Sequence, residues 1–484
     1  MEALKNAPAE IIRKAVITTM NANTQSSWLG HPRGLFLLCG TELWERFSFY
    51  AMRAILVLYL TDKTINGGLG WTTQDALNLY GIYTGLVYLT PVFGGWLADN
   101  FLGQRRSIII GGALMAIGQF TLALPNSFID PYELHAFYVG LGFLIVGNGL
   151  FKPNISTMVG QLYGEGDNRR DGAFTIFYMG INLGSLLAGL IAGTASIHYG
   201  WKAGFLCAGI GMLISLVIQL VLAQRFLGSI GIEPAAKKQL RESGSNEKQP
   251  LTAIERDRLK VIVVMSLFVI IFWAGFEQAG GLMNIYSQQY TDRMIGAFEV
   301  PAAWFQSLNP MFIIIMAPLL AVVWRRLDDN EPSSPIKFAM AMGFLALGFV
   351  CMVGAAMQQG GDMSVKASMW WLVGAYFFHT LGELCLSPIG LSLITKLAPL
   401  RLMSVMMGTW FCANAVANYV AGFIGSHVGD AGPLAIFGGI AVTAAVAGVL
   451  LVICSSKLVE WMHGAEGNPV SVRKVGEEST APAV

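Results

Sequence analysis

Residues 41–53 read Thr-Glu-Leu-Trp-Glu-Arg-Phe-Ser-Phe-Tyr-Ala-Met-Arg, so that two acids and two bases stand between the apolar segments 34–40 and 54–60. At about 100° per residue, positions 42, 45, 46, 49 and 53 fall on one face of a helix. A charged side chain near the centre of a bilayer costs at least ~2.5 kcal/mol, which means that four of them on one helix should face protein or water. The stretch therefore predicts a polar pathway inside a membrane protein.

The composition of the whole chain supports this interpretation. Hydrophobic residues make up 54% of the 484 residues and charged residues 13%, against about 25% charged in soluble domains, and the mean hydropathy is +0.56. Apolar runs long enough to cross a bilayer, about 20 residues, predict twelve helices. They lie near 34–61, 75–98, 106–125, 134–161, 172–197, 202–224, 260–288, 303–324, 336–357, 368–397, 402–427 and 433–456.

The positions of the 31 lysines and arginines predict the orientation. If both termini are cytoplasmic, 24 of these residues lie inside, 4 outside, and 3 within the spans. The positive-inside rule strongly favours that arrangement. Residues 1–33 are polar and contain no apolar core of a cleavable signal peptide. We expect a protein of the cytoplasmic (inner) membrane whose first helix is its insertion signal.

A polar segment at 225–259 divides the chain into two parts of six predicted helices each. Residues 147–153 (Gly-Asn-Gly-Leu-Phe-Lys-Pro) align with 382–388 (Gly-Glu-Leu-Cys-Leu-Ser-Pro), which suggests a duplication. The predicted organisation is an arm at 1–33, a six-helix bundle at 34–224, a linker at 225–259, a second six-helix bundle at 260–456 and a tail at 457–484. The expected fold class is an all-α membrane protein with twelve transmembrane helices in two six-helix bundles around a central cavity.

A short loop follows the second predicted helix, where residues 95–106 read Gly-Trp-Leu-Ala-Asp-Asn-Phe-Leu-Gly-Gln-Arg-Arg. This loop resembles the cytoplasmic loop motif of the major facilitator superfamily. The resemblance implies that glycine permits close helix contact and that an aspartate and an arginine pair across helices near the cytoplasmic rim. The residues concerned are Gly95, Asp99, Gly103, Arg105 and Arg106. An ordinary turn of the positive-inside type is the alternative.

Further motifs make the chain resemble the proton-dependent oligopeptide transporter family of the major facilitator superfamily. They are the E-x-x-E-R-F motif at 42–47, followed by residues 149–154, 174–185, 272–280, 304–310 and 382–388, in the family's order. The resemblance covers about residues 34–456. It implies the major facilitator fold and proton-driven symport of di- and tripeptides.

The chain departs from the family pattern in three features. Many members have two tyrosines after the motif, whereas Phe49 precedes Tyr50 here, so that one hydroxyl is missing. The segment between the halves is too short and polar for the two extra helices of many bacterial members. Animal members use a histidine in helix two for proton binding, but residues 75–98 contain none. Proton coupling is therefore expected to depend on carboxylates.

Seven ionisable residues lie near the middle of predicted helices one, four, seven and ten: Glu42, Glu45, Arg46, Arg53, Lys152, Glu277 and Glu383. These are the first helices of each three-helix unit, which are expected to surround the central cavity. The alternative is that the charges only form salt bridges within the bundle. Buried ion pairs seldom stabilise a fold more than apolar residues would, which disfavours that alternative.

The termini of a zwitterionic peptide would match these charges. Arg53 offers a fork and Lys152 a point charge to the carboxylate, and Glu383 from the other half would receive the ammonium. The resemblance implies the same allocation, with Asn182 and Asn309 as partners of the peptide backbone. The full set of predicted peptide-binding residues is Tyr50, Arg53, Tyr88, Lys152, Asn182, Trp304, Asn309, Glu383, Ser387 and Trp410.

Proton coupling needs a carboxylate whose proton affinity changes as a neighbouring cation moves. Glu42 and Glu45 beside Arg46, and Glu277 facing Arg53, meet this description. Two pairs join the halves and are predicted gates: Arg53 with Glu277 toward the periplasm, and Lys152 with Glu383 toward the cytoplasm.

Carriage of another small anion such as nitrate remains an alternative within the family, and a peptide sensor without transport is an alternative from another class. The polar segments are too short for the output domain of a sensor. No span carries a metal-ligand or nucleophile set, so we expect neither an enzyme nor a metal or other cofactor. The expected partners are peptides, protons and the lipid bilayer, with no nucleic acid, and the expected state is a monomer.

Overall fold

The structure, a computed structural model, describes residues 27–125, 128, 130–164, 167, 169–234, 251–327, 330–362, 364–399 and 402–465. Parts of three predicted segments lie outside the described residues: 1–26 of the arm, 235–250 of the linker and 466–484 of the tail.

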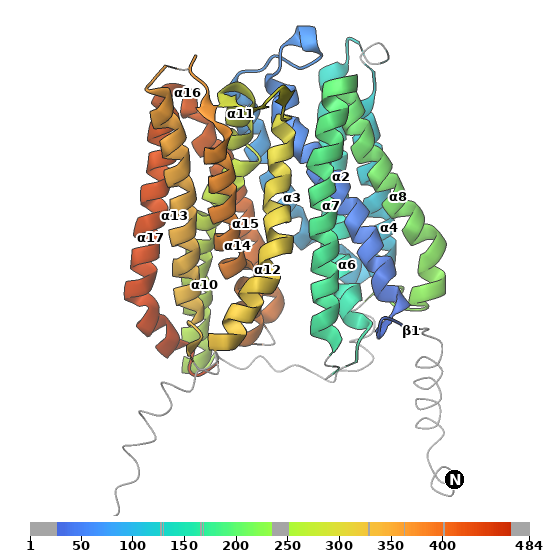
Figure 1. The fold of residues 1–484 in the computed structure, drawn as a ribbon. Coiled ribbons are helices and arrows are strands. Elements are labelled where there is room, and N and C mark those ends of the chain that lie inside the picture. The colour runs from blue at the N-terminus through green and yellow to red at the C-terminus, as the bar shows by residue number, and fades with distance from the viewer. Residues whose placement is uncertain are drawn as a thin grey trace, which may run out of the picture.

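The first half of the chain forms a bundle of long helices (Figure 1). They are α2 (Arg33–Thr61), α3 (Thr73–Leu97), α4 (Gln104–Ala123), α6 (Glu133–Gln161), α7 (Arg169–Tyr199) and α8 (Trp201–Leu227). Short elements connect or precede them: the paired strands β1 (Ser27–Trp28) and β2 (His31–Pro32), the 3-10 turn η2 (Thr64–Asn66) and the π-helical turn η3 (Ala98–Leu102).

The second half forms a similar bundle. Its helices are α10 (Ala253–Phe276), α11 (Leu282–Gln289), α12 (Leu308–Leu327), α13 (Ser334–Gln359), α14 (Met369–Leu397), α15 (Met403–Ser426), the short α16 (Val428–Ala431) and α17 (Pro433–Trp461), with 3-10 turns η4 (Glu277–Ala279) and η5 (Ala302–Ser307). Strand β3 (Thr291–Asp292) pairs in parallel with β6 (Ala367–Ser368), and β4 (Met294–Ile295) forms an antiparallel hairpin with β5 (Phe298–Glu299).

Most of these helices can cross a membrane. Nine spans within the described residues are long and apolar enough, with α10 to α11 and η5 to α12 each counted as one span. The long helices α2, α3 and α15 are not among the nine. In α2 the reason is charge, because every 18-residue window of this helix holds at least three charged residues. At about 1.5 Å per residue, its 29 residues still exceed the ~30 Å hydrocarbon core.

The outer helices present apolar side chains outward, as lipid contact requires. Val221 of α8 is 66% exposed and Ile453 of α17 is 70% exposed. Figure 1 places both helices on the sides of the molecule. In water such surfaces would be costly, whereas in a bilayer they match the hydrocarbon.

Two helix boundaries differ from the sequence-based expectation. Helix α10 begins at Ala253 rather than near 260, because Thr252 and Glu255 form a capping box that satisfies the first backbone N–H groups. The predicted helix 260–288 is also interrupted: α10 ends at Phe276, a 3-10 turn follows, and α11 starts at Leu282. This break falls at the charged residue Glu277.

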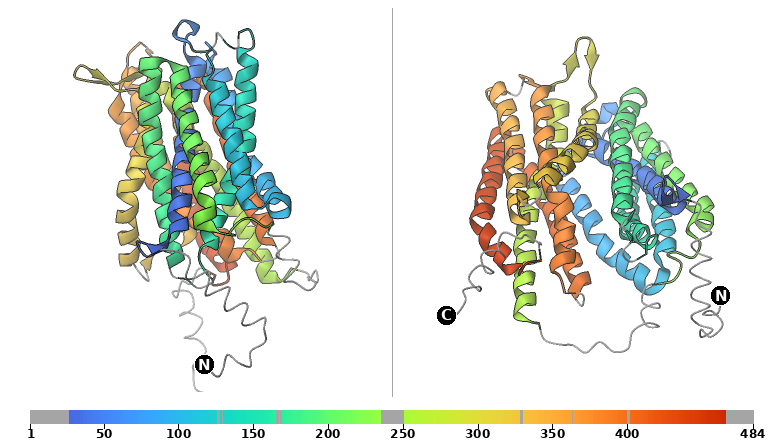
Figure 2. Two further views of the ribbon diagram at one scale, coloured as in Figure 1. Left: turned by 90° about the vertical axis from the view of Figure 1, so that its right-hand side faces the viewer. Right: turned by 60° about the horizontal axis from the view of Figure 1, so that its bottom comes forward.

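The two halves stand side by side and meet most closely at one end. We call the end that holds the start of α2 and the end of α17 the lower end, and the opposite end the upper end, as drawn in Figure 1. Helices α3 and α15 approach each other where Gly81 faces Gly422, and a Cβ on Gly81 would lie 2.8 Å from the Gly422 Cα. Toward the lower end the ribbons of α7 and α12 spread apart (Figures 1 and 2).

The side-chain hydrogen bonds between the two halves also lie away from the lower end. Among the described residues, four join the halves: Arg53 to Glu277, Asn284 to the Ala54 carbonyl, Trp304 to Thr194, and Ser307 to the Leu186 carbonyl. All four involve α2 or α7 at or above the middle of the helix. The molecule is therefore closed at its upper end.

Candidate functional site

The first charged cluster lies within α2 itself. The Arg46 guanidinium forms a two-pronged contact with Glu45, at 2.5 Å from Nε to Oε2 and 2.7 Å from Nη2 to Oε1. Its Nε also lies 3.3 Å from Glu42 Oε1. All three residues are at most 4% exposed, and the second Glu42 oxygen, Oε2, has no hydrogen-bond partner in the described part of the chain. Within ion-pair distance, one buried cation thus serves two acids.

A second cluster lies one to two turns higher on α2 and reaches the other half. Arg53 Nη2 donates to Glu277 Oε2 at 2.5 Å, and Arg53 Nε donates to the Tyr80 hydroxyl at 2.8 Å. Its guanidinium carbon also lies 5.6 Å from the centre of the Tyr50 ring. Both charged partners are buried, with 8% and 3% of their surfaces exposed. This ion pair holds α2 against the break between α10 and α11.

The break that positions Glu277 is supported by neighbouring side chains. A break in a helix leaves backbone carbonyls unsatisfied, and in a membrane they must find partners within the protein. The Ala279 carbonyl accepts hydrogen bonds from Gln306 Nε2 at 2.6 Å and from the Tyr376 hydroxyl at 3.2 Å. Gln306 also contacts the Tyr376 hydroxyl at 2.9 Å. Gln306 and Tyr376 thus support the helix break two residues after Glu277.

Gly280 allows Arg53 to reach this break. A Cβ at position 280 would lie 2.1 Å from the Tyr80 hydroxyl and 2.6 Å from Arg53 Nε. Neither distance is possible for real atoms, so any side chain there would push the arginine and the tyrosine away. The position needs glycine for close approach rather than for an unusual backbone angle.

Lys152 and Glu383 lie on opposite halves, and neither forms an ion pair with any described residue. The Lys152 ammonium lies 4.1 Å from the centre of the Tyr88 ring. Glu383 Oε2 accepts a hydrogen bond from Asn309 Nδ2 at 2.8 Å, and the same amide contacts Thr380 Oγ1 at 3.1 Å. Of the two predicted gate pairs, Arg53 with Glu277 is in contact, and Lys152 with Glu383 is not.

The remaining predicted peptide-binding residues differ in how far contacts within the protein already occupy them. Asn182 donates to the Tyr178 carbonyl of its own helix, and Trp304 Nε1 donates to Thr194 Oγ1. Trp410 is 6% exposed and packs against Gly390, where a Cβ would lie 2.3 Å from its ring. Trp410 is therefore a packing residue in this conformation, whereas Ser387, one turn beyond Glu383, is partly exposed.

The predicted loop motif shows one difference from expectation. Asp99 lies in the π-helical turn η3, but it forms no ion pair with Arg105 or Arg106 in the described part of the chain. Arg105 Nη1 instead donates to the Gly228 carbonyl at 3.0 Å. The reason is local packing: Gly103 has a φ of +76° and abuts the Ile232 carbonyl, which brings the loop against the end of α8. Gly95 lies beside Pro153, where a Cβ would be 3.6 Å away.

Sequence reasoning missed the neutral residues of the site. Tyr80 contacts Arg53, and Gln306 and Tyr376 contact the helix break. Thr380 contacts Asn309, which in turn donates to Glu383. The adjacent glycines 280 and 281 were a signal for the break, because paired glycines inside an apolar run disfavour a continuous helix.

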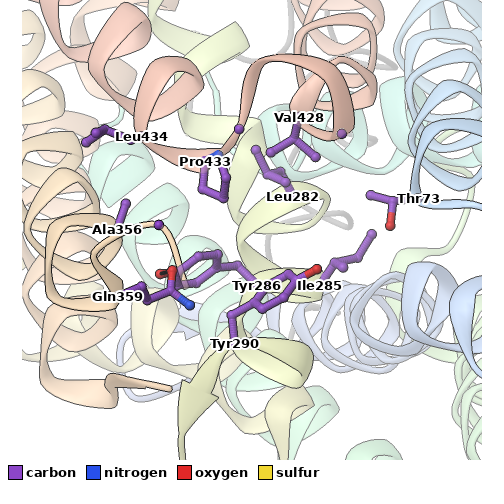
Figure 3. A pocket seen from close by; sticks show the side chains of 13 residues that line it. Thr73, Leu282, Ile285, Tyr286, Tyr290, Ala356, Gln359, Val428, Pro433 and Leu434 are labelled. Atoms are coloured by element: carbon purple, nitrogen blue, oxygen red, sulfur yellow. Dashed lines mark hydrogen bonds between the residues drawn. The ribbon is translucent and has the colours of Figure 1, made fainter. Parts of the chain in front are cut away.

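Two cavities lie at the upper end, apart from these clusters. Figure 3 shows one of about 480 Å³ between α11, the end of α13 and the start of α17, where the Tyr286 hydroxyl donates to Gln359 Oε1 at 2.6 Å. It contains none of the predicted site residues. The other, of about 560 Å³, lies between the two halves.

Comparisons with known proteins agree with these features. The sequence pattern of the POT family matches residues 105–242 and 251–432. The chain is 37% identical to the uncharacterized transporter YclF of Bacillus subtilis, over 91% of this chain and 97% of that protein. It is 36% identical to the peptide transporter YePEPT of Yersinia enterocolitica, over 85% and 91%, and 33% identical to a di-/tripeptide transporter of Lactococcus lactis, over 91% and 98%.

Solved structures show the same architecture. A crystal structure of a peptide transporter POT in complex with sulfate superposes with a TM-score of 0.84 at 35% identity, covering 92% of this chain and 99% of that one. A POT family transporter in complex with 5-aminolevulinic acid gives a TM-score of 0.82 at 30% identity, covering 90% and 98%.

Proposed function

The chain belongs to the POT family, and from this premise we propose that it is a proton-coupled symporter that imports di- and tripeptides by alternating access. The observation that carries the proposal is the pair of unmatched charges on opposite halves. Lys152 on α6 and Glu383 on α14 both lack an ion partner among the described residues. A ligand with one carboxylate and one ammonium would neutralise both.

The substrate class follows from the spacing of charges in a peptide. At ~3.5 Å per extended residue, the termini of a di- or tripeptide stand about 5–9 Å apart. In the proposal, Lys152 and Arg53 receive the carboxylate and Glu383 receives the ammonium. Asn309 already contacts Glu383, so it would orient the acid toward the amine. Tyr50, Tyr88 and Trp304 offer apolar faces that tolerate different peptide side chains.

The names of relatives in the family support a peptide as the substrate. YePEPT is named a peptide transporter and the Lactococcus lactis relatives are named di-/tripeptide transporters. One solved relative holds a thioalcohol-conjugated peptide. Import of peptides is therefore a better-supported function for this chain than carriage of nitrate.

Proton coupling is assigned to the two clusters on α2. A proton on Glu42 or Glu45 would remove the excess negative charge around Arg46, and a proton on Glu277 would weaken its bridge to Arg53. One proton moving down ~100 mV supplies about 2.3 kcal/mol, roughly a fifty-fold concentration ratio. That is sufficient for nutrient uptake before any pH gradient is added.

We assign the lower end to the cytoplasm and the upper end to the periplasm of a cell whose inner membrane holds the protein. Arg105, Arg106, Arg325 and Arg326 all belong to the lower ends of helices, as the positive-inside rule requires. With this orientation, the structure is the state closed to the periplasm. The proposed functional unit is a monomer that needs no cofactor besides protons.

Uptake by purified protein in liposomes tests this function. With an acidic outside and a negative inside, labelled dialanine should accumulate above its external concentration, and a proton ionophore should abolish the accumulation. Labelled nitrate in a parallel series tests the alternative anion. Dialanine binding without any uptake would indicate a sensor and would contradict the proposal.

A further inference from the structure

The cavity of about 560 Å³ between the halves does not belong to the proposed peptide site. Its walls come from the ends of α2 and α7 in the first half and from α11, the β4–β5 hairpin and η5 in the second. Ile55 and Leu58 of α2 and Asp62, which directly follows α2, line the cavity, and all three come after Arg53 toward the periplasm. The cavity therefore lies outside the Arg53–Glu277 bridge, and its volume is typical of small-molecule sites, about 300–1,000 Å³. We call it the periplasmic cavity.

The second half contributes a buried arginine. Arg293 is only 8% exposed, although its hairpin neighbours Ile295 and Phe298 are 57% and 51% exposed. Its Nη1 donates to the Val300 carbonyl at 2.5 Å, and its Nη2 donates to Glu299 Oε1 at 2.7 Å. The remaining Nε is buried and has no partner among the described residues. Arg293 thus places a guanidinium in the cavity wall, and one of its three nitrogens makes no hydrogen bond to the described residues.

The first half contributes an acid on the opposite wall. Asp62 accepts hydrogen bonds from Trp201 Nε1, Asn66 Nδ2 and the Lys63 backbone N–H, each at 2.9 Å. These donors are neutral, and Asp62 forms no ion pair with any described residue. Because Glu299 already pairs with Arg293, Asp62 is the charge of the cavity lining that has no ion partner in the described part of the chain.

We propose that the periplasmic cavity is a second ligand site, which takes a small zwitterion with its ammonium toward Asp62 and its carboxylate toward Arg293. The proposal rests on the proposed function, because it assumes a transporter that alternates between two states. The two walls belong to different halves, so the site is complete only while the periplasmic side is closed.

A ligand that binds one state only must stabilise that state. A zwitterion in the periplasmic cavity would hold the halves together and delay reopening to the periplasm. Uptake should therefore rise with external peptide, pass through a maximum and fall. When the second site is half filled, the rate should be reduced about twofold, because half of the carriers are held closed.

The test is the dependence of initial uptake on external dialanine in liposomes with an imposed proton gradient. Wild-type protein should show inhibition at high concentration. Asp62→Asn and Arg293→Gln should remove the descending part of the curve and keep uptake at low concentration. Lys366→Gln, which changes an exposed charge elsewhere on the periplasmic side, is the matched control and should behave as wild type. Free alanine, added at fixed low dialanine, distinguishes an amino acid from a peptide as the inhibitory zwitterion.

A third cavity variant keeps the test valid if the two charge variants misfold. Gln288 is exposed and lines the cavity, so Gln288→Trp should fill the space without removing a charge and should also relieve inhibition. A curve that saturates without a maximum in the wild type, with alanine inert, would overturn the second site. Inhibition that persists in all three cavity variants would overturn it equally. Absence of uptake even at low dialanine would instead count against the proposed function.

Discussion

Arg53 makes two directed contacts that a point charge cannot reproduce. One nitrogen donates to Glu277 and another to Tyr80, and the planar fork is also suited to a carboxylate. Arg53→Lys keeps the charge but has a single nitrogen. We expect the affinity for dialanine to fall at least tenfold, about 1.4 kcal/mol. Competition against a labelled dipeptide in liposomes measures this, and wild-type affinity in the variant would refute the role of Arg53.

Gly280→Ala probes the same contact from the other side. The new methyl group would overlap the Tyr80 hydroxyl and the Arg53 side chain, so we expect uptake to be largely lost while the protein still inserts into the membrane. Gly439→Ala is the matched control, because a Cβ at that helical position meets nothing within 4 Å. Equal uptake by the two variants would show that the close approach at Gly280 is unimportant.

The sequence reveals the charged residues of the site more readily than the neutral ones. Glu42, Glu45 and Arg46 stand out because a charge within an apolar run has few possible explanations. Tyr80 and Tyr376 do not stand out, since a tyrosine in a membrane helix packs equally well against lipid, a neighbouring helix or a polar partner. Only the three-dimensional contact with Arg53 or the Ala279 carbonyl distinguishes them.

Among the helices, α2 concentrates the acids assigned to proton coupling. Glu42→Gln or Glu45→Gln should abolish accumulation driven by a pH gradient, because the amide cannot take up and release a proton. Peptide exchange without a gradient should persist in part, since the proposed peptide ligands lie elsewhere. Glu460→Gln, at the exposed end of α17, is the control. A parallel loss of exchange and driven uptake would mean that these acids are not specific to coupling.

The interruption after α10 shows why helix boundaries were harder to predict than helix positions. Residues 253–289 count as one span that is apolar enough to cross a membrane, so a continuous helix over 260–288 was the natural expectation. The break depends on Gln306 and Tyr376, which satisfy the Ala279 carbonyl from η5 and α14. Such partners are distant in sequence. The start of α10 at Ala253, by contrast, has a local signal in the Thr252–Glu255 capping box.

For the whole molecule, the prediction of a helical membrane transporter with the major facilitator fold is confirmed by the family match and the superposed structures. Twelve long helices lie in the described part of the chain, nine of them within spans that meet the length and hydropathy criteria. The conformation could not be predicted. Arg53–Glu277 and Lys152–Glu383 were equally plausible bridges, and a transporter must be able to form both closed states from one sequence.

The two bridges should control the balance between these states. Glu277→Gln replaces an ion pair with a neutral contact, so the population open to the periplasm should grow. Lys152→Ala removes one partner of the cytoplasmic bridge, so the population open to the cytoplasm should grow. In the proposed orientation, spin labels at the exposed positions Ile65 and Ile295 report the periplasmic rim, and labels at Thr157 and Thr395 report the cytoplasmic rim. Unchanged distance distributions in both variants would exclude the gate roles.

Proton entry driven by peptide alone tests the coupling most directly. In liposomes with equal pH on both sides and the membrane potential clamped at zero, an inward gradient of dialanine should acidify the interior, because symport obliges protons to move with the peptide. The expected result is acidification that depends on the protein and disappears in Glu42→Gln. Peptide entry at the wild-type rate without any change of internal pH would contradict proton-coupled symport.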